Sequence, residues 1–345
     1  MQIAFLCEFG GAHGWGHLIR CTAMAQAASS LGWRTILVAD GPCERMPQEA
    51  EEAFDSFEFV GSFDSLPESV LNSDVLFADF MYRENEFYHS IQRSFIGKGE
   101  LGKVFVATDD MQKRRMDAVD IVVNPEIGLN ETAYEPKKYQ LLGEKYCYLR
   151  RGFSKTKKRL IELDLDKPVP IFVMIGGTDP WNLSAPVLRE LAASSRYSFS
   201  PTLLSGEKTD QLGNLKECFA LFPHFRWVTS ISSNEMAELM SSCALGVTAC
   251  GSSVFEMAAL NIPFVGLSIV DNQTATARKI ETNWKLPILH LEDRKEGQPI
   301  GVVSAVESLL EDSSRFSLPY SSVDTSGCNR IMDVVRDCLA DKVQT

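Results

Sequence analysis

A glycine-rich stretch near the N-terminus is the first place where residue types and spacing suggest chemistry. The segment Phe9–Gly16 (FGGAHGWG) lies between an apolar run ending at Cys7 and an alanine-rich helical pattern over about 17–30. Glycines let the backbone turn tightly and approach a ligand closely. The N-terminus of the following helix offers free N–H groups and the positive end of its dipole. The pattern predicts a strand, an anion-binding loop and a helix.

A histidine occupies the first turn of this predicted helix. At His17 the helix dipole disfavours the imidazolium form, which leaves a neutral imidazole available as a general base. The alternative is a histidine that only hydrogen-bonds a neighbouring loop. His13, inside the glycine run, is a weaker candidate base, and for it the role of a solvated loop residue is favoured.

Two similar strand–loop–helix junctions occur in the second half of the chain. Gly176-Gly177 follows an apolar run, and 250–253 (CGSS) separates a strand ending near Thr248 from a helix that carries Glu256. Backbone N–H groups and hydroxyls at such junctions can bind an anion. Glu256 is suited to accept hydrogen bonds from two ribose hydroxyls, or is simply a favourable acid in a first helical turn. Three such loops indicate a nucleotide diphosphate site.

Two other ligand classes fit less well. Asp40 ends the second predicted strand, where a dinucleotide site has its ribose-binding acid, but the glycines run GxxGxG rather than GxGxxG, which argues against a nicotinamide cofactor. Asp79, Asp109 and Asp110 also follow predicted strands. A metal site would need ligands converging from several loops, so we expect neither a metal nor a resident cofactor.

The elements that must position these residues alternate between strand and helix. Helices are predicted near 17–30, 234–242, 253–260 and 273–282. Short apolar runs between turn signals predict buried parallel strands. These runs are Ile3–Cys7, Thr35–Ala39, Val75–Ala78, Val104–Ala107, Ile121–Val123, Ile171–Ile175, Thr202–Leu204, Phe225–Val228, Leu245–Thr248 and Pro263–Leu267.

The fold class is therefore α/β, with two Rossmann-like doubly wound domains that we expect to face one another across a cleft. The first domain is assigned to 1–153 and the second to 171–315, joined by a charged, proline-containing linker at 154–170. The segment 316–345 is assigned to a closing C-terminal helix.

Composition excludes several function classes. The chain has 345 residues, 45% hydrophobic and 23% charged, as in ordinary globular proteins, and its net charge of -12 argues against binding to nucleic acid or anionic membranes. No apolar stretch is long enough for a transmembrane helix, and the N-terminus lacks the basic region of a signal peptide. Nine scattered cysteines are typical of reduced thiols. We expect a cytoplasmic protein, and the sequence carries no signal for an oligomeric state.

Three motifs together resemble a known family. They are Gly14–Arg20 (GWGHLIR), Gly176–Leu183 (GGTDPWNL) and Gly251–Glu256 (GSSVFE), the last followed by Asn272-Gln273. The set is similar to the UDP-sugar hydrolases of the pseudaminic acid pathway and their spore-coat polysaccharide relatives. That family is itself similar to the glycosyltransferase that adds N-acetylglucosamine to lipid intermediates in peptidoglycan synthesis. Further similarity lies near the hinge, at Gly143, Tyr146, Leu149, Arg150 and Phe153, and in the closing helix, at Asp324, Gly327 and Arg330.

The resemblance implies a GT-B fold and hydrolysis of a UDP-activated amino or deoxy sugar, in nonulosonic acid or surface polysaccharide biosynthesis. It implies that His17 activates water, that Asn272 is a second catalytic residue near the reacting sugar, and that Glu256 holds the ribose. Gly14 and Gly16 would shape the histidine loop. The other implied substrate contacts are Arg20, Asp79, Met81, Gly176, Gly177, Gly251, Ser252, Ser253 and Gln273.

The chain departs from the family pattern at two strand ends. Asp79-Phe80-Met81 replaces the usual Asp-His-Tyr, with Tyr82 displaced by one position, and Glu8-Phe9 replaces the usual Asp-Ser. Both changes are expected to face the cleft. Two other functions therefore stay open: a glycosyltransferase that uses a UDP-sugar donor, and a catalytically silent nucleotide-sugar binding protein.

Overall fold

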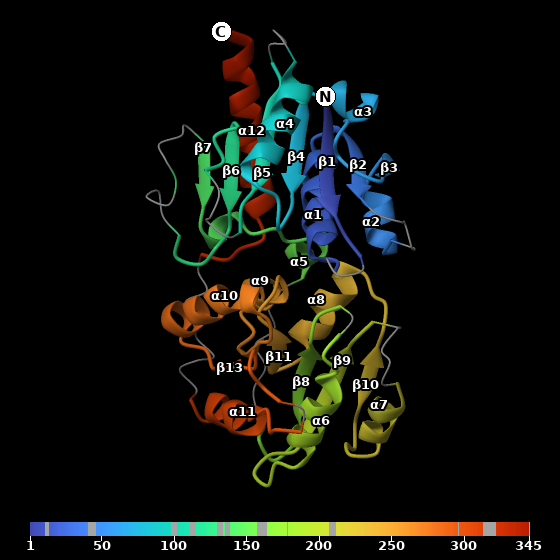
Figure 1. The fold of residues 1–345 in the computed structure, drawn as a ribbon. Helices are drawn as coiled ribbons and strands as arrows, with labels where there is room; N and C mark the ends of the chain where they lie inside the picture. Colours follow the sequence, from blue (N-terminus) through green and yellow to red (C-terminus); the bar gives the residue numbers. More distant parts are fainter. Residues whose placement is uncertain are drawn as a thin grey trace. The chain divides into compact units, whose positions relative to one another are not determined.

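The computed structural model describes residues 1–10, 14–40, 46–97, 102–110, 115–129, 134, 139–156, 164–177, 179–206, 212–295, 297–312 and 322–344 (Figure 1). The chain forms two compact units. One comprises Met1–Arg151 together with Asp324–Thr345, and the other comprises Gly152–Val323. Seven of the seventeen residues assigned to a linker, 157–163, lie outside the described residues, and positions 169 and 170 at its end already belong to a strand of the second unit.

The first unit is built on a seven-stranded sheet whose hydrogen-bonded neighbours all run parallel, in the order β3-β2-β1-β4-β5-β6-β7. Its elements are β1 (Gln2–Glu8), α1 (Gly16–Ser30), β2 (Arg34–Asp40), α2 (Gln48–Ala53), β3 (Ser56–Val60), α3 (Glu68–Leu71), β4 (Val75–Asp79), α4 (Asn85–Ile96), β5 (Val104–Thr108), β6 (Ile121–Asn124), β7 (Tyr139–Leu142), η2 (Glu144–Tyr146) and α12 (Gly327–Gln344).

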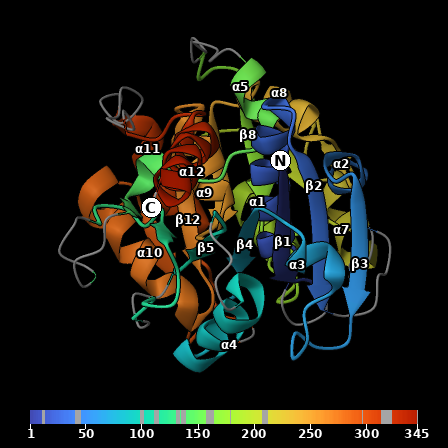
Figure 2. The same cartoon turned by 90° about the horizontal axis from the view of Figure 1, so that it is seen from above.

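Both faces of this sheet are covered, because alternate residues of its central strands are buried in two different apolar clusters. Ile3 and Phe5 of β1 belong to a cluster with residues of α1, α2 and α12. Ala4 and Leu6 belong to the cluster that contains residues of α3 and α4. Figure 2 shows α4 and α12 on opposite sides of the sheet. This burial on both faces explains why the central strands are continuous apolar runs.

The second unit repeats the plan with six parallel strands in the order β10-β9-β8-β11-β12-β13. Helix α5 (Arg151–Lys155) begins at the boundary between the units. The other elements are β8 (Val169–Met174), α6 (Ser184–Ala192), β9 (Phe199–Leu204), α7 (Leu212–Phe219), β10 (Arg226–Val228), α8 (Ser233–Ser241), β11 (Leu245–Ala249), α9 (Ser253–Ala259), β12 (Phe264–Ser268), η3 (Asp271–Gln273), α10 (Thr274–Lys279), η4 (Ile280–Trp284), β13 (Ile288–His290) and α11 (Val302–Glu311).

Each sheet has a point at which the strand order reverses direction. In the first unit β1 lies between β2 and β4, and in the second unit β8 lies between β9 and β11. In open α/β sheets ligands bind outside the carboxyl ends of the strands at this point. The loops that follow β1, β4, β8 and β11 are therefore the places to look for sites. Within the described ranges, no helix combines the length and apolarity needed to cross a bilayer.

The C-terminal helix α12 returns to the first unit, and one glycine allows its close approach. A Cβ atom added at Gly327 would lie 2.2 Å from the carbonyl oxygen of Cys147. The thiol of Cys328 donates a long hydrogen bond, 3.9 Å, to the carbonyl oxygen of Leu149. Arg330 forms an ion pair with Asp324 just before the helix. The start of α12 is therefore packed directly against the backbone of 146–149.

This packing makes Gly327→Ala a test of how α12 docks. The added methyl group forces backbone apart, so the free energy of unfolding of the first unit should fall by about 1–3 kcal/mol, as measured by calorimetry. Gly213→Ala, in α7, is the matched control because a Cβ atom added there would have nothing within 4 Å. That variant should be neutral or gain up to about 1 kcal/mol in helix propensity. Equal stability of Gly327→Ala and wild type would contradict the packing.

Candidate functional site

The described part of the loop after β1 leads into the first turn of α1. Gly10 and Gly14 both have positive φ angles, +79° and +64°, and the N–H of Gly10 donates to the carbonyl oxygen of Gly14 at 2.8 Å. The first hydrogen bond of α1 runs from Ile19 to Trp15 at 3.0 Å. The N–H groups of residues 16, 17 and 18 have no hydrogen-bond acceptor in the described part of the chain. His13 and the rest of 11–13 lie outside the described residues.

His17 lies at the switch point of the first sheet and contacts a buried carboxylate. Its Nδ1 atom is 3.0 Å from Oδ1 of Asp79, the last residue of β4. The side chain of Asp79 has no solvent exposure and that of His17 is 4% exposed. The other ring nitrogen, Nε2, has no hydrogen-bond partner among the described residues. An imidazole oriented by a carboxylate on one nitrogen and open on the other is the arrangement of a general base.

Arg20 holds Asp79 from the other side. Its Nε and Nη2 atoms donate to the two carboxylate oxygens at 2.8 and 2.6 Å, which is a bidentate ion pair. Its Nη1 atom donates to Oδ2 of Asp110, two residues beyond the end of β5, at 2.6 Å. The guanidinium also lies 5.8 Å from the ring centre of Tyr148. Arg20 thus links the carboxyl ends of β4 and β5.

The charges of this cluster stabilise one another despite burial. Burial opposes ionisation of Asp79, but the neighbouring Arg20 and His17 outweigh it and lower the pKa of the carboxyl from its usual value. Burial lowers the pKa of Arg20, whereas the negative charges of Asp110 and Asp79 raise it. The net result is a pKa well above the usual arginine value. Burial and the Asp79 charge raise the pKa of Tyr148. Asp79 and Arg20 are therefore ionised, whereas Tyr148 is neutral.

The Nδ1 atom of His17 faces both an acceptor and a donor, since Arg20 Nη2 lies 2.9 Å away. A guanidinium nitrogen only donates, so the two contacts require different tautomers. With the proton on Nδ1, His17 donates to Asp79 and its Nε2 lone pair is free to accept a proton. With the proton on Nε2, the ring accepts from Arg20 and has no lone pair left for a substrate. The tautomer thus decides whether His17 is a base.

Two residues predicted as substrate contacts, Arg20 and Asp79, are paired with each other and both contact His17. Arg20 and Asp79 are held by each other, and Asp79 has no exposed atoms with which to touch a ligand. A direct contact of Asp79 with substrate is therefore ruled out, whereas the side chain of Arg20 is 15% exposed and its predicted contact with substrate stays a prediction. Sequence reasoning also missed Asp110 as their partner. The spacing of His17 and Arg20, i and i+3 on one face of a helix, is the signal that could have revealed the cluster.

The carboxylates that follow β4 and β5 have protein partners. Arg20 bridges Asp79 and Asp110, as described above. Asp109, buried beside them, accepts a hydrogen bond from the Tyr134 hydroxyl at 2.8 Å. Within the described residues, no three His, Cys, Asp or Glu side chains converge in a way that could hold a metal ion.

The two departures from the family pattern differ in where they lie. Phe80 was expected to face the cleft, and this is wrong: the ring is 2% exposed and packs edge-on against Phe63 and Phe87, each at 5.1 Å. Its apolar character explains this burial in the core beside β4. Met81, predicted to contact substrate, is partly exposed.

The other departure, Glu8-Phe9, stays at the end of β1. Glu8 forms an ion pair with Arg83, whose guanidinium lies 4.9 Å from the ring centre of Phe87. Phe9 stacks on Trp15 at 5.7 Å, directly before α1. Arg83 was not identified from the sequence, because nothing in its local spacing links it to the end of β1, and Trp15 was quoted in the glycine-rich loop but given no role.

In the second unit, the Gly176-Gly177 loop leads to a helix that is already capped. The carboxylate of Asp179 accepts hydrogen bonds from the N–H groups of Leu183 and Ser184 at 2.9 and 2.8 Å. Burial raises the pKa of Asp179, opposed by these same hydrogen bonds. Two N–H groups at the start of α6 are therefore taken by Asp179 and cannot bind an anion, while the predicted anion contact of the Gly176 and Gly177 amides stays a prediction.

The Gly251–Ser253 junction, by contrast, has donors that no described residue accepts from. The N–H groups of Ser252 and Ser253 have no acceptor within the described ranges. The Ser253 hydroxyl pairs with Thr248 at 2.7 Å, and Glu256, one turn into α9, is 5% exposed.

Further along, Asn272, the expected second catalytic residue, is exposed on η3. The side-chain oxygen of Gln273 accepts the N–H of Ile269 at 3.0 Å. The side chain of Gln273 therefore closes its own turn, whereas Asn272 is open to solvent.

The buried ion pair gives a prediction for stability and pH. Asp79→Asn removes one partner of a buried pair, so the free energy of unfolding should fall by about 3 kcal/mol at neutral pH. The folded-state pKa of Asp79 is lowered, so its stabilisation is present above about pH 4 and is lost as the pH falls through the folded-state pKa. Denaturant unfolding should show the difference between variant and wild type shrinking below about pH 4.

Asp117→Asn is the matched control, because this carboxylate is 41% exposed and faces His89 at 3.3 Å in the same unit. Its effect should stay within about 0.5 kcal/mol. A difference for Asp79→Asn that is equally large in acid and at neutral pH would contradict the ionised pair.

Comparison with known proteins places this geometry in a recognised fold. No family model matches the chain. An uncharacterized protein of Methanocaldococcus jannaschii is 28% identical over 312 residues, 86% of this chain, and the chain spans 61% of that protein's length. Among solved structures, MurG of Acinetobacter baumannii is 12% identical with a TM-score of 0.58 and covers 97% of this chain and 99% of its own.

Two further structures are similar over nearly the whole chain. The kitacinnamycin glycosyltransferase is 13% identical, with a TM-score of 0.65 and 98% of both chains covered. The UDP-GlcNAc 2-epimerase of Neisseria meningitidis, solved with UDP-GlcNAc, is 8% identical, with a TM-score of 0.58 and 98% and 100% coverage. These likenesses, with the two parallel sheets of seven and six strands, establish that the chain has the GT-B fold of two Rossmann-like units.

Proposed function

We propose that the chain hydrolyses a UDP-activated amino or deoxy sugar, with His17 as the base that activates water. One observation carries the proposal: an imidazole in the first turn of α1, oriented by the buried Asp79, at the switch point of the first sheet. Proteins of the same fold include an epimerase solved with a UDP-sugar and several glycosyltransferases. The resemblance of the sequence motifs to UDP-sugar hydrolases favours water as the acceptor.

In the proposed reaction Nε2 of His17 accepts a proton from water as the oxygen attacks the anomeric carbon. The bond from that carbon to the diphosphate oxygen breaks, and UDP leaves with the bonding electron pair. The imidazolium that forms is stabilised by the Asp79 carboxylate on Nδ1. Arg20 keeps Asp79 ionised and fixed, so the base does not have to reorganise its surroundings during the step.

The negative charge of the leaving group calls for donors that are already oriented. The N–H groups of Ser252 and Ser253 before α9, which have no acceptor among the described residues, are donors of this kind. The proposal assigns the diphosphate to such amides and the ribose to Glu256, and it requires no metal ion. It places the reaction in the cytoplasm, in nonulosonic acid or surface polysaccharide synthesis, as the motif resemblance implies.

A glycosyltransferase is the second candidate, because the MurG and kitacinnamycin enzymes share the fold. In that case His17 would deprotonate an acceptor hydroxyl instead of water. A silent nucleotide-sugar binding protein is the third. UDP release from candidate UDP-sugars separates the three: release without acceptor supports the hydrolase, release only with acceptor supports the transferase, and thermal stabilisation by UDP without any release supports the binding protein.

Replacing His17 should slow the reaction without weakening the binding of UDP. His17→Ala should lower the rate of UDP release by about 10²- to 10⁴-fold, because a positioned general base contributes that much. UDP affinity, measured by calorimetric titration, should change little, since His17 acts on the water and not on the nucleotide.

His89→Ala is the matched control, because it removes a His–Asp pair from the surface of the same unit, where His89 is 32% exposed. This variant should release UDP at the wild-type rate. Wild-type turnover in His17→Ala would exclude His17 as the base and with it the proposed mechanism.

A further inference from the structure

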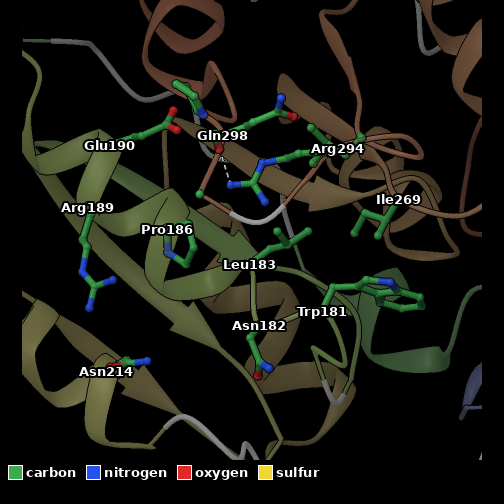
Figure 3. A pocket seen from close by; sticks show the side chains of 13 residues that line it. Trp181, Asn182, Leu183, Pro186, Arg189, Glu190, Asn214, Ile269, Arg294 and Gln298 are labelled. Carbon is green, nitrogen blue, oxygen red and sulfur yellow. Dashed lines mark hydrogen bonds between the residues drawn. The ribbon is translucent and has the colours of Figure 1, made fainter.

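A cavity of about 800 Å³ lies within the second unit, outside every motif discussed so far except the end of 176–183. Figure 3 shows its walls: α6 and the turn before it on one side, and the segment after β13 on the other. Its volume is in the range of small-molecule sites. The floor is apolar, with Leu183, Pro186 and Ile269 among its lining residues.

Trp181 forms one wall of the cavity, and its side chain is exposed to solvent. It is 54% exposed, and among the five tryptophans of the chain it alone is an exposed residue. The turn that carries it is fixed by two residues with positive φ, Asp179 at 42° and Asn182 at 53°, and by the hydrogen bonds of Asp179 to the start of α6. An indole face presented on a rigid turn is a stacking surface with little entropy left to lose on binding.

The opposite wall of the cavity contains a hydrogen-bond donor that has no partner among the described residues. Arg294 donates through Nη2 to the carbonyl oxygen of Gln298, but its Nε atom is buried with no hydrogen-bond partner among the described residues. A buried N–H left unsatisfied costs about 1–3 kcal/mol, which a ligand acceptor or water would recover. In Figure 3 the guanidinium of Arg294 lies in the middle of the cavity, on the side of α6.

The acidic side chain in the cavity wall, Glu190, already accepts hydrogen bonds from backbone N–H groups. The carboxylate of Glu190 accepts the N–H groups of Gly301 and Val302 at 2.9 and 3.0 Å, at the start of α11. Arg189 forms an ion pair with Glu217 at 3.3 Å. The other polar side chains of the lining are Arg294 and three amides, Asn182, Asn214 and Gln298.

We propose that this cavity binds a carbohydrate, with a pyranose ring stacked on Trp181 and its hydroxyl or carboxylate oxygens beside Arg294. The C–H face of a pyranose is apolar and flat enough to lie on an indole. An amide side chain carries both donors and an acceptor, which is the complement of a sugar hydroxyl that both donates and accepts. This site is distinct from the amides of Ser252 and Ser253 and does not depend on the proposed hydrolysis.

The position of the cavity supports this distinction. Right-handed crossovers place α6, between β8 and β9, on the opposite face of the second sheet from α9, between β11 and β12. The cavity adjoins α6, whereas the free N–H groups of Ser252 and Ser253 begin α9. A ligand in the cavity therefore need not be the nucleotide.

The test uses the full chain labelled with 5-fluorotryptophan and observed by fluorine NMR. Probes are methyl glycosides of a hexose and of an N-acetylhexosamine, and free hexuronic acid, compared with uridine and UDP. The Trp181 resonance, assigned with Trp181→Phe, should shift in a saturable way with at least one saccharide. Arg294→Met should weaken that binding by at least about tenfold, equivalent to about 1.4 kcal/mol.

Leu221→Ala is the control, because this exposed apolar side chain of the same unit does not line the cavity. It should bind the saccharide as wild type does. The proposal is overturned if no saccharide shifts the Trp181 signal, if only uridine or UDP does so, or if Arg294→Met and Leu221→Ala bind the saccharide equally. Since all readouts are of binding, an inactive hydrolase does not affect the outcome.

Discussion

A buried carboxylate is the constraint on which the candidate site depends. Asp79 has no contact with solvent, and an isolated charge there would be too costly to keep. Two hydrogen bonds from Arg20 and one contact with His17 stabilise it. Because Arg20 also reaches Asp110, the ends of β4 and β5 and the first turn of α1 form one electrostatic unit. His17 therefore occupies a fixed place that its own sequence neighbourhood does not determine.

The same strand–loop–helix motif has different consequences in the two units. At α1 and α9 the first N–H groups have no acceptors among the described residues, whereas at α6 the carboxylate of Asp179 takes two of them. A glycine-rich loop before a helix is thus not sufficient for an anion site. Whether the start of the helix can bind an anion depends on whether the loop also carries a side chain that caps the helix. At α6 that cap fixes the turn on which Trp181 stands.

Much of the fold could be predicted from the sequence because the central strands are buried on both faces. The run Ile3–Cys7 corresponds to β1, and the pattern over 17–30 to α1. The strands missed, β3, β7 and β13, are all at sheet edges, where burial is partial and the apolar run is interrupted. The pairing of Arg20 with Asp79 spans 59 positions in the sequence, so only the i, i+3 spacing of His17 and Arg20 offers a local signal for it.

Catalysis by His17 depends on which of its ring nitrogens carries the proton, and long-range ¹⁵N–¹H NMR of His17 measures this. The proposed mechanism requires a ring whose Nδ1 carries the proton donated to Asp79 and whose Nε2 is unprotonated. His17→Gln assigns the signal. An Nε2-protonated ring, whose Nδ1 accepts from Arg20, would contradict the account, because His17 would then have no lone pair with which to activate water.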